Sequence, residues 1–314
     1  AAASVVEKVI AISRPFVQVE NTRVALGDLA QRWREKHAVK VVGVTGSNGK
    51  TTTKEMLASI LNQAGNVLAT KGNFNNDIGL PKTLFELTEA HQYAVLEMGA
   101  NHIGEITRLA SIANPDIGII TLCAPAHLEG FGSIEGVAKA KGELFAALPE
   151  NGVAIINADD DFSDYWSEIS GARSQIKFGL MPGADVFATD ISARALGCGT
   201  SFKFNFRDSS VQASIPHDGV HNVLNALAAG AGALALGCTI DQIITGLAQS
   251  TLVSGRLNIL QLNERVKIID DTYNANPASL MAAVGVATDA DGECWVVMGD
   301  MGELGADGTD IHQR

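Results

Sequence analysis

Short apolar runs alternate with amphipathic segments through the first half of the chain. The apolar runs predict strands at Lys40–Thr45, Tyr93–Glu97, Asp116–Leu122 and Val153–Asn157. The segments between them carry apolar residues at helical spacing and predict helices at Thr51–Gln63, Leu80–Leu87, Ile103–Ile112 and Ile134–Leu148. Because these strands are apolar on both faces, they are expected to be buried on both sides. The pattern therefore predicts an α/β fold, with a mostly parallel central sheet and helices on both faces.

The hydrophobic pattern changes after Asp160. The stretches ADVFATDISAR, TSFKFNF and SSVQASIP predict strands joined by turns that contain glycine or serine, and hence a small antiparallel annex. Helical spacing returns at HNVLNALAAGAGALALG and TIDQIITGLAQ, where Thr239 and Gln242 fit a capping box. Beyond LVSGRLNIL, the stretches VKIIDD, PASLMAAVGVA and CWVVMGD predict a strand–helix–strand unit.

Composition narrows the classes of protein that fit. The 314 residues are 46% hydrophobic, and this length is typical of about two domains. The net charge of −12 argues against a nucleic-acid partner, because such surfaces are normally basic. The cysteines form no C-x-x-C pair, so we expect free thiols in a reducing compartment. No apolar run is long enough for a transmembrane segment, and nothing calls for an oligomer. We therefore expect a cytoplasmic monomer.

A glycine-rich stretch, VTGSNGKTTTKEM, joins the first of these strands to the next helix. Gly49, Lys50 and Thr51 match the end of the general phosphate-binding pattern, but Val44 stands where that pattern has its first glycine. The glycine that is present, Gly46, lies three residues before Gly49. Backbone amides in such a turn, together with the N-terminus of the helix, attract phosphate. We therefore expect Lys50 to reach the β- and γ-phosphates and Thr51 to bind Mg²⁺.

Polar residues follow several other predicted strands. Glu97 ends one strand, at the edge where ligands bind in open α/β sheets, and it fits either a Mg²⁺ ligand or a solvated carboxylate. His127 lies in a later loop, and Lys139 and Lys141 lie in the helix beyond it. Histidines in loops are usually structural, and lysines on helices are usually solvated. Residue type and position alone therefore predict no catalytic or binding role for these three residues.

Two polar loops leave their roles open. GNFNNDIGLP holds Asn73, Asn75, Asn76 and Asp77, which either form turns or present amides to a polar substrate. IIDDTYNANP holds adjacent carboxylates, a tyrosine and asparagines, which form either an ordinary turn or the polar rim of a site.

Taken together, these stretches resemble the Mur ligase family. The family loop follows [ST]-G-x-x-G-K-[ST], and residues 45–51 match it, which accounts for the short glycine spacing. Further family-like stretches are GNFNNDIGLP, LEMGANHIGEI, AHLEGFGSIEGVAKAKGE, DDTYNANPASLMAAV and MGDMGELG. The resemblance covers nearly the whole chain from Val41 onward and is weaker in the predicted annex.

The resemblance implies three domains. Residues 1–38 would be the remnant of an N-terminal UDP-substrate domain, and residues 39–254 a central ATP-binding domain of the P-loop ATPase type. Residues 255–314 would start a Rossmann-like C-terminal ligase domain. Because the family normally continues well beyond MGDMGELG, we expect a fragment that lacks most of its two outer domains. Since closure of the C-terminal domain completes the site, we expect little or no turnover from this chain alone.

The activity that the resemblance implies is ATP-dependent formation of an amide bond through an acyl phosphate. The stretches are most similar to the branch that adds D-alanyl-D-alanine to UDP-N-acetylmuramoyl-tripeptide in peptidoglycan precursor synthesis. Two alternatives stay open. One is a regulatory nucleotide-binding module or plain NTPase, and the other is a family member that adds a different amino acid.

The resemblance also implies roles for single residues. Lys50, Glu97, His127 and Lys141 would be catalytic, with Thr51 and Glu97 on one Mg²⁺. His127 and Lys141 would serve a second Mg²⁺, Lys141 as an N-carbamate. The muramoyl-peptide would lie against Asn75 and Asn76. The residues that would bind ATP are Gly46, Ser47, Asn48, Gly49, Lys50, Thr51, Thr52, Asn222, Asn225, Arg256 and Asp271.

Overall fold

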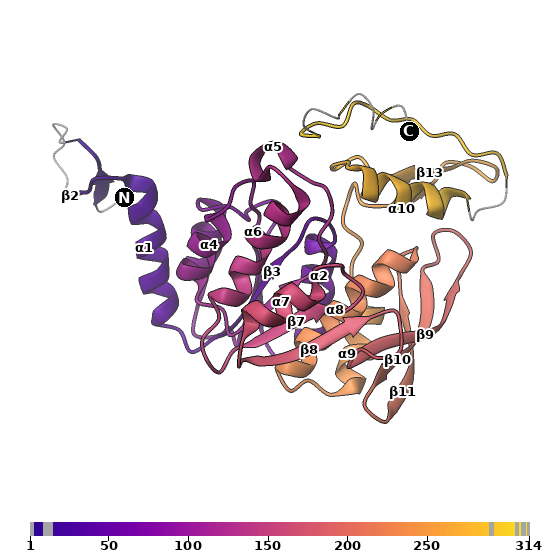
Figure 1. Cartoon of the computed structure of the whole chain (residues 1–314), viewed down its shortest axis with the longest axis horizontal. Helices are drawn as coiled ribbons and strands as arrows, with labels where there is room; N and C mark the ends of the chain where they lie inside the picture. Colours follow the sequence, from indigo (N-terminus) through magenta and orange to yellow (C-terminus); the bar gives the residue numbers. More distant parts are fainter. Residues whose placement is uncertain (1–2, 9–14, 289–291, 305–307, 309–311, 313–314) are drawn as a thin grey trace.

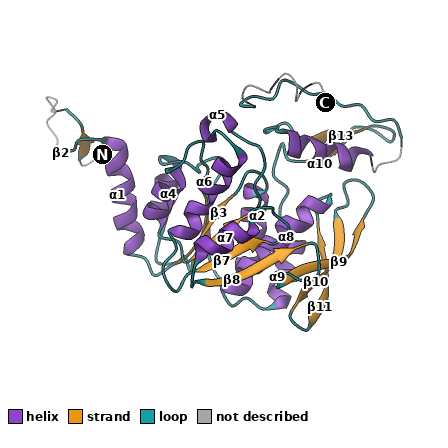
Figure 2. Ribbon diagram, in the orientation of Figure 1, coloured by secondary structure: helices purple, strands orange, loops and turns teal. Residues whose placement is uncertain are grey.

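The computed structural model describes residues 3–8, 15–288, 292–304, 308 and 312. Within these residues the largest sheet has nine strands (Figures 1 and 2). In spatial order they are β11 (Ser209–Ile215), β10 (Thr200–Phe206), β9 (Val186–Ala193), β8 (Ser174–Gly179), β7 (Val153–Asn157), β6 (Ile117–Ile120), β3 (Lys40–Thr45), β5 (Tyr93–Glu97) and β4 (Val67–Ala69). Neighbours from β4 to β9 pair in parallel, whereas β9, β10 and β11 are antiparallel.

The predicted fold class is confirmed. The bounds of β3, β5 and β7 agree with the apolar runs that predict them, and β6 is shorter than predicted at both ends. The antiparallel annex is present, but it is not a separate sheet. Strand β9 pairs in parallel with β8 and antiparallel with β10, so the annex continues the main sheet at one edge.

Helices cover both faces of the sheet (Figure 1). The helices on one face are α2 (Lys50–Leu61), α8 (Val220–Ala235) and α9 (Ile240–Ala248). The helices on the other face are α1 (Thr22–Glu35), α3 (Gly79–Leu84), α4 (Glu105–Ala113), α6 (Ile134–Ala146) and α7 (Ser163–Ser170), with the short α5 (Leu128–Phe131) against α6. Successive side chains of a strand point to opposite faces, so Val42 and Val44 of β3 pack under α2 while Val41 packs on the α4 side.

The capping box predicted for the second of the two late helices is confirmed in α9. The Thr239 hydroxyl accepts from the backbone N–H of Gln242, and the Gln242 side chain accepts from the backbone N–H of Thr239. No helix in the described part of the chain is long and apolar enough to cross a membrane.

Two smaller units flank the central sheet. Near the N-terminus, β1 (Ser4–Val6) pairs in parallel with β2 (Phe16–Gln18). After α9, a hairpin of β12 (Asn258–Gln261) and β13 (Lys267–Asp270) leads to α10 (Pro277–Thr288). We refer to residues 255–304 as the C-terminal unit.

The strand predicted for CWVVMGD is wrong. Residues 294–300 form no regular element, and the side chains of Trp295 and Val297 are 82% and 97% exposed. A strand needs a neighbouring strand to pair its backbone groups, and β12 and β13 pair with each other instead. An apolar run forms a strand only where another strand lies beside it to pair with.

Candidate active site

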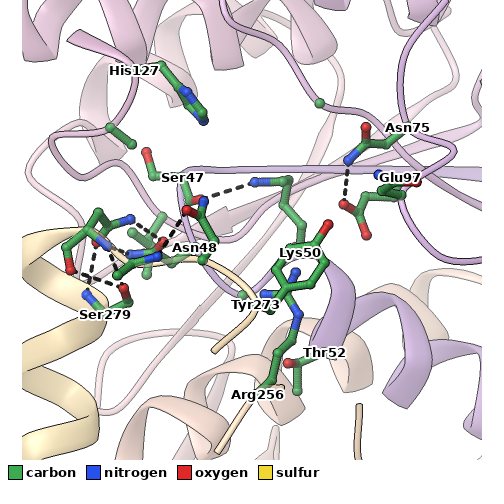
Figure 3. A pocket seen from close by; sticks show the side chains of 18 of the residues that line it. Ser47, Asn48, Lys50, Thr52, Asn75, Glu97, His127, Arg256, Tyr273 and Ser279 are labelled. Carbon is green, nitrogen blue, oxygen red and sulfur yellow. Dashed lines mark hydrogen bonds between the residues drawn. The ribbon is translucent and has the colours of Figure 1, made fainter. Parts of the chain in front are cut away.

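A cavity of about 650 Å³ lies at the carboxyl ends of the central strands. The loops that follow β3, β5 and β6 form its floor, and residues of α8 and the C-terminal unit form the opposite wall (Figure 3). In an open α/β sheet, ligands bind at this edge. The fold therefore gathers the polar stretches singled out in the sequence around a single cavity.

Glycine is required at two positions of the loop that follows β3. Gly46 has φ 145° and Gly49 has φ 80°, which are conformations that other residues rarely adopt. A Cβ atom on Gly46 would lie 1.9 Å from the Thr121 hydroxyl oxygen, and one on Gly49 would lie 2.2 Å from Oδ1 of Asn225. The short glycine spacing thus has a physical cause, because the loop passes directly against β6 and α8.

Gly46→Ala is expected to destabilise the fold by about 2–5 kcal/mol, since strain from the positive φ adds to the steric conflict with Thr121. Gly171→Ala is the matched control. Gly171 has φ 59°, but a Cβ there would meet nothing within 4 Å, so only about 1–2 kcal/mol of strain is expected. Urea denaturation of both variants measures the difference, and equal losses of stability would contradict the close packing of the loop.

Lys50 begins α2 and is held over the loop. Its ammonium donates to the carbonyl oxygens of Gly46 at 2.8 Å and Ser47 at 3.0 Å. Burial lowers the pKa of Lys50, while the Glu97 carboxylate opposes that shift. Gly49 caps α2 without a side-chain hydrogen bond, so no side chain competes with a phosphate for the first amides of the helix.

Glu97 meets Thr51 at the carboxyl end of β5. The Thr51 hydroxyl and the Asn75 amide each donate to the Glu97 carboxylate at 2.8 Å, and Glu97 is only 2% exposed. The Thr70 hydroxyl accepts from the Glu97 backbone N–H at 3.0 Å and fixes the strand end. Hydroxyl and carboxylate oxygens are the ligands that Mg²⁺ prefers, so this pair fits the predicted ion.

The asparagine loop forms a turn, which is one of the two roles that the sequence left open, and it also contacts Glu97. Asn75 and Asn76 both line the cavity. Asn75 holds Glu97, whereas Asn76 accepts from the backbone N–H groups of Ile78 at 3.1 Å and Gly79 at 2.8 Å and so forms the turn into α3. That Asn75 and Asn76 contact a substrate stays a prediction.

His127 and Lys141 occupy different surroundings. His127 lines the cavity, and its Nδ1 contacts the carboxylate of Glu303. Lys141 is 2% exposed, lies outside the cavity lining and holds its ammonium 5.2 Å from the centre of the Phe131 ring. Burial, helped by the charge of Lys50, lowers the pKa of Lys141 to about 7. Lys139 is exposed. The difference in burial therefore distinguishes Lys141 from Lys139, which residue type and position in the sequence did not.

The opposite wall brings together the other predicted ATP-binding residues. On α8 the Asn225 amide donates to Oδ1 of Asn222 at 3.1 Å. From the C-terminal unit, the Arg256 guanidinium stacks 4.2 Å from the centre of the Tyr273 ring. Asp271 accepts from the backbone N–H of Leu257 at 3.1 Å, and burial raises its pKa. Ser47, Asn48, Thr52 and these residues all line the cavity.

The sequence did not predict several of the contacts and residues that form the cavity. Asn48 and Asn276 exchange two amide hydrogen bonds, at 2.6 and 3.2 Å, across 228 residues of sequence. His217 and His221 line the same wall, and burial lowers the pKa of each to about 4. Asn276 and the MGDMGELG stretch that contains Glu303 were noted in the sequence. The residues around them, however, do not indicate which distant residues they contact.

Comparison with known proteins decides the family. Residues 44–233 match the Mur ligase middle domain, and residues 255–314 match the family model described as Mur ligase, glutamate ligase domain. The chain belongs to the Mur ligase family. The resemblance seen in the sequence is thereby confirmed.

Curated members of the Mur ligase family align with nearly all of this chain. The UDP-N-acetylmuramoyl-tripeptide--D-alanyl-D-alanine ligase of Escherichia coli K12 is 46% identical over 99% of this chain and 69% of its own length. The protein of the same name from Haemophilus influenzae is 45% identical over 96% of this chain and 66% of its own length. This chain thus spans about two thirds of the length of these relatives.

Solved Mur ligase structures share the fold. MurF from Acinetobacter baumannii superposes with a TM-score of 0.94 at 43% identity, covering 98% of this chain and 67% of that one. MurF ligase from Thermotoga maritima in complex with ADP superposes with a TM-score of 0.91 at 32% identity, covering 100% and 72%. The matches extend over nearly all of this chain and over 67% and 72% of those two chains. The expectation of a fragment is not borne out by them and stays a prediction. The division into three domains stays a prediction.

Proposed function

We propose that this protein uses ATP to join D-alanyl-D-alanine to UDP-N-acetylmuramoyl-tripeptide during the synthesis of peptidoglycan precursors. The observation that carries the proposal is the meeting of the glycine loop, Glu97 and the asparagine loop in one cavity. Relatives named for this reaction are 45–46% identical to the chain. We also propose that the protein acts as a monomer in the cytoplasm.

The chemistry begins with a carboxylate, which is a poor acyl donor because its oxygen is a poor leaving group. A carboxylate oxygen attacks the γ-phosphorus of ATP, and ADP leaves. The amine then attacks the carbonyl carbon of the acyl phosphate, loses a proton and expels phosphate. Phosphoryl transfer depends on positioning and on neutralising charge.

This chain supplies both the positioning and much of the positive charge. We assign the β- and γ-phosphates to Lys50 and the amides of residues 46–51, a loop in which Gly46 and Gly49 have no room for a side chain. Thr51 and Glu97 would hold Mg²⁺, which neutralises phosphate charge when bound. Asn75 keeps the Glu97 carboxylate oriented through its hydrogen bond, and we propose that the peptide substrate lies beside Asn75.

We further propose that Lys141 is an N-carbamate that serves a second Mg²⁺ with His127. The burial of Lys141 favours an uncharged amine. Such an amine adds carbon dioxide and releases a proton, giving an anionic oxygen ligand in place of a cation. Carbon-13 NMR with labelled bicarbonate is expected to show a carbamate signal that is lost in Lys141→Ala. A wild-type spectrum without that signal would contradict the assignment.

Phosphate release tests the proposed reaction. Because little or no turnover is expected from this chain alone, activity is measured in a full-length enzyme that contains it. With ATP and Mg²⁺ present, we expect release to require both UDP-N-acetylmuramoyl-tripeptide and D-alanyl-D-alanine. Equal release without the acceptor dipeptide would indicate a plain NTPase. Release that depends on a different amino acid, and not on D-alanyl-D-alanine, would indicate another ligase of the same family.

A further inference from the structure

The cavity contains a histidine–carboxylate pair between two distant parts of the chain. His127 follows β6 and is the N-cap residue of α5, whereas Glu303 lies 176 residues later in the C-terminal unit. Nδ1 of His127 contacts Oε2 of Glu303, and both residues line the cavity. The His127 ring points toward the centre of the cavity, above the loop of Ser47 and Lys50 (Figure 3). The pair is therefore part of the cavity wall.

The backbone at both ends of this contact is unusual. His127 has φ 53° and Glu303 has φ 61°, conformations that are uncommon for residues other than glycine. Such strain persists only where the surroundings hold it, and it gathers at functional sites. The backbone on both sides of Glu303 is held in place, because Met301 and Leu304 are buried and the Met301 N–H donates to Nε2 of His312 at 2.8 Å.

A second contact holds the same two parts of the molecule together. Asn276 caps α10 by accepting from the backbone N–H of Ser279 at 2.9 Å, and its amide pairs with Asn48 of the glycine loop. The C-terminal unit thus contacts the loops at the carboxyl ends of the central strands at two separate points, Asn48 after β3 and His127 after β6. The position of Glu303 relative to His127 follows from this arrangement.

The contact determines which nitrogen of His127 carries hydrogen. An ionised carboxylate only accepts hydrogen bonds, so Nδ1 must be the donor. In a neutral imidazole the other nitrogen, Nε2, then keeps its lone pair. Metal-binding histidines commonly donate their second ring N–H to a carboxylate in this way, which fixes both tautomer and ring orientation.

We infer that Glu303 is a positioning residue that holds His127 as the Nδ1–H tautomer and turns the Nε2 lone pair toward a divalent cation in the cavity. The inference rests on the proposed function, which places a cation beside His127. It adds that the cation site is complete only when the C-terminal unit lies against the glycine loop.

Two variants of Glu303 separate this role from a merely structural one. Glu303→Leu removes the acceptor at similar size, whereas Glu303→Gln keeps an acceptor oxygen without the charge. Glu150 is exposed and lies outside the cavity lining, so Glu150→Leu is the matched control. Melting temperatures of all variants establish that each is folded before binding is compared.

Two readouts are used, and neither depends on turnover. Long-range nitrogen-15 NMR is expected to show the Nδ1–H tautomer of His127 in the wild type and in Glu303→Gln, and its loss in Glu303→Leu. The affinity for Mn²⁺ beside a non-hydrolysable ATP analogue, followed by electron paramagnetic resonance, is expected to fall roughly 10- to 100-fold in Glu303→Leu. We expect a smaller loss in Glu303→Gln and none in Glu150→Leu.

The outcomes separate failure of the inference from failure of the proposed function. Mn²⁺ affinity that is equal in wild type and Glu303→Leu would overturn the role of Glu303 while leaving the ligase proposal in place. A wild-type His127 that is protonated on Nε2 would do the same. A wild-type protein that binds the nucleotide but no Mn²⁺ would contradict the proposed metal site, and the inference with it.

Discussion

Lys50→Ala is expected to lower the affinity for ATP at least about 100-fold while leaving the fold intact. The Lys50 ammonium lies over the loop that would hold the phosphates. Hydrogen bonds to charged groups contribute about 1.5–3 kcal/mol each, so the loss of contacts to two phosphates gives an effect of this size. The fold is expected to survive because burial already disfavours the charged form of Lys50.

Calorimetric titration with ATP measures the affinity, and thermal melting without nucleotide measures the stability. Lys139→Ala is the control, since Lys139 is an exposed helix lysine outside the cavity lining. An unchanged affinity in Lys50→Ala would show that the loop does not hold the phosphates of ATP.

Glu97→Gln is expected to lower kcat/KM roughly 100- to 1,000-fold, the range found when one preorganised electrostatic group is removed. The substitution preserves shape but removes a buried negative charge beside Thr51 and Lys50. A neutral amide is also a weaker ligand for Mg²⁺ than a carboxylate. Stability is expected to change much less, because Gln keeps an oxygen that accepts from Thr51 or Asn75.

Substrate-dependent phosphate release gives kcat/KM for this comparison. Glu89→Gln serves as the control, because Glu89 is exposed and lies outside the cavity lining. Raising the Mg²⁺ concentration is expected to recover part of the lost rate in Glu97→Gln. If the rate were the same as in the wild type, Glu97 would have no part in the reaction.

The central strands and the glycine loop could be predicted because their signals are local. An unbroken apolar run such as β3 indicates burial on both faces of a parallel strand. The bounds of β3 could be predicted from its own residues, without knowing which strands lie beside it. The loop is local as well, since Gly46, Gly49 and Lys50 lie within five residues and the chemistry of phosphate restricts what can stand there.

Contacts between distant residues could not be predicted in this way. Asn48 and Asn276 are separated by 228 residues, and nothing in either stretch indicates that their amides pair. Burial was equally hidden at Lys141, whose neighbour Lys139 carries the same side chain in the same helix. The missing strand in CWVVMGD has the same cause, because a strand depends on a partner that sequence pattern does not locate.

The central claim is that the phosphate held by the glycine loop activates a carboxylate. Oxygen-18 in the terminal carboxylate of UDP-N-acetylmuramoyl-tripeptide tests it most directly, in a single turnover with ATP, Mg²⁺ and D-alanyl-D-alanine. An acyl phosphate passes one carboxylate oxygen to the phosphate that leaves, so the released phosphate is expected to carry one labelled oxygen. Formation of the amide product with unlabelled phosphate would contradict the claim.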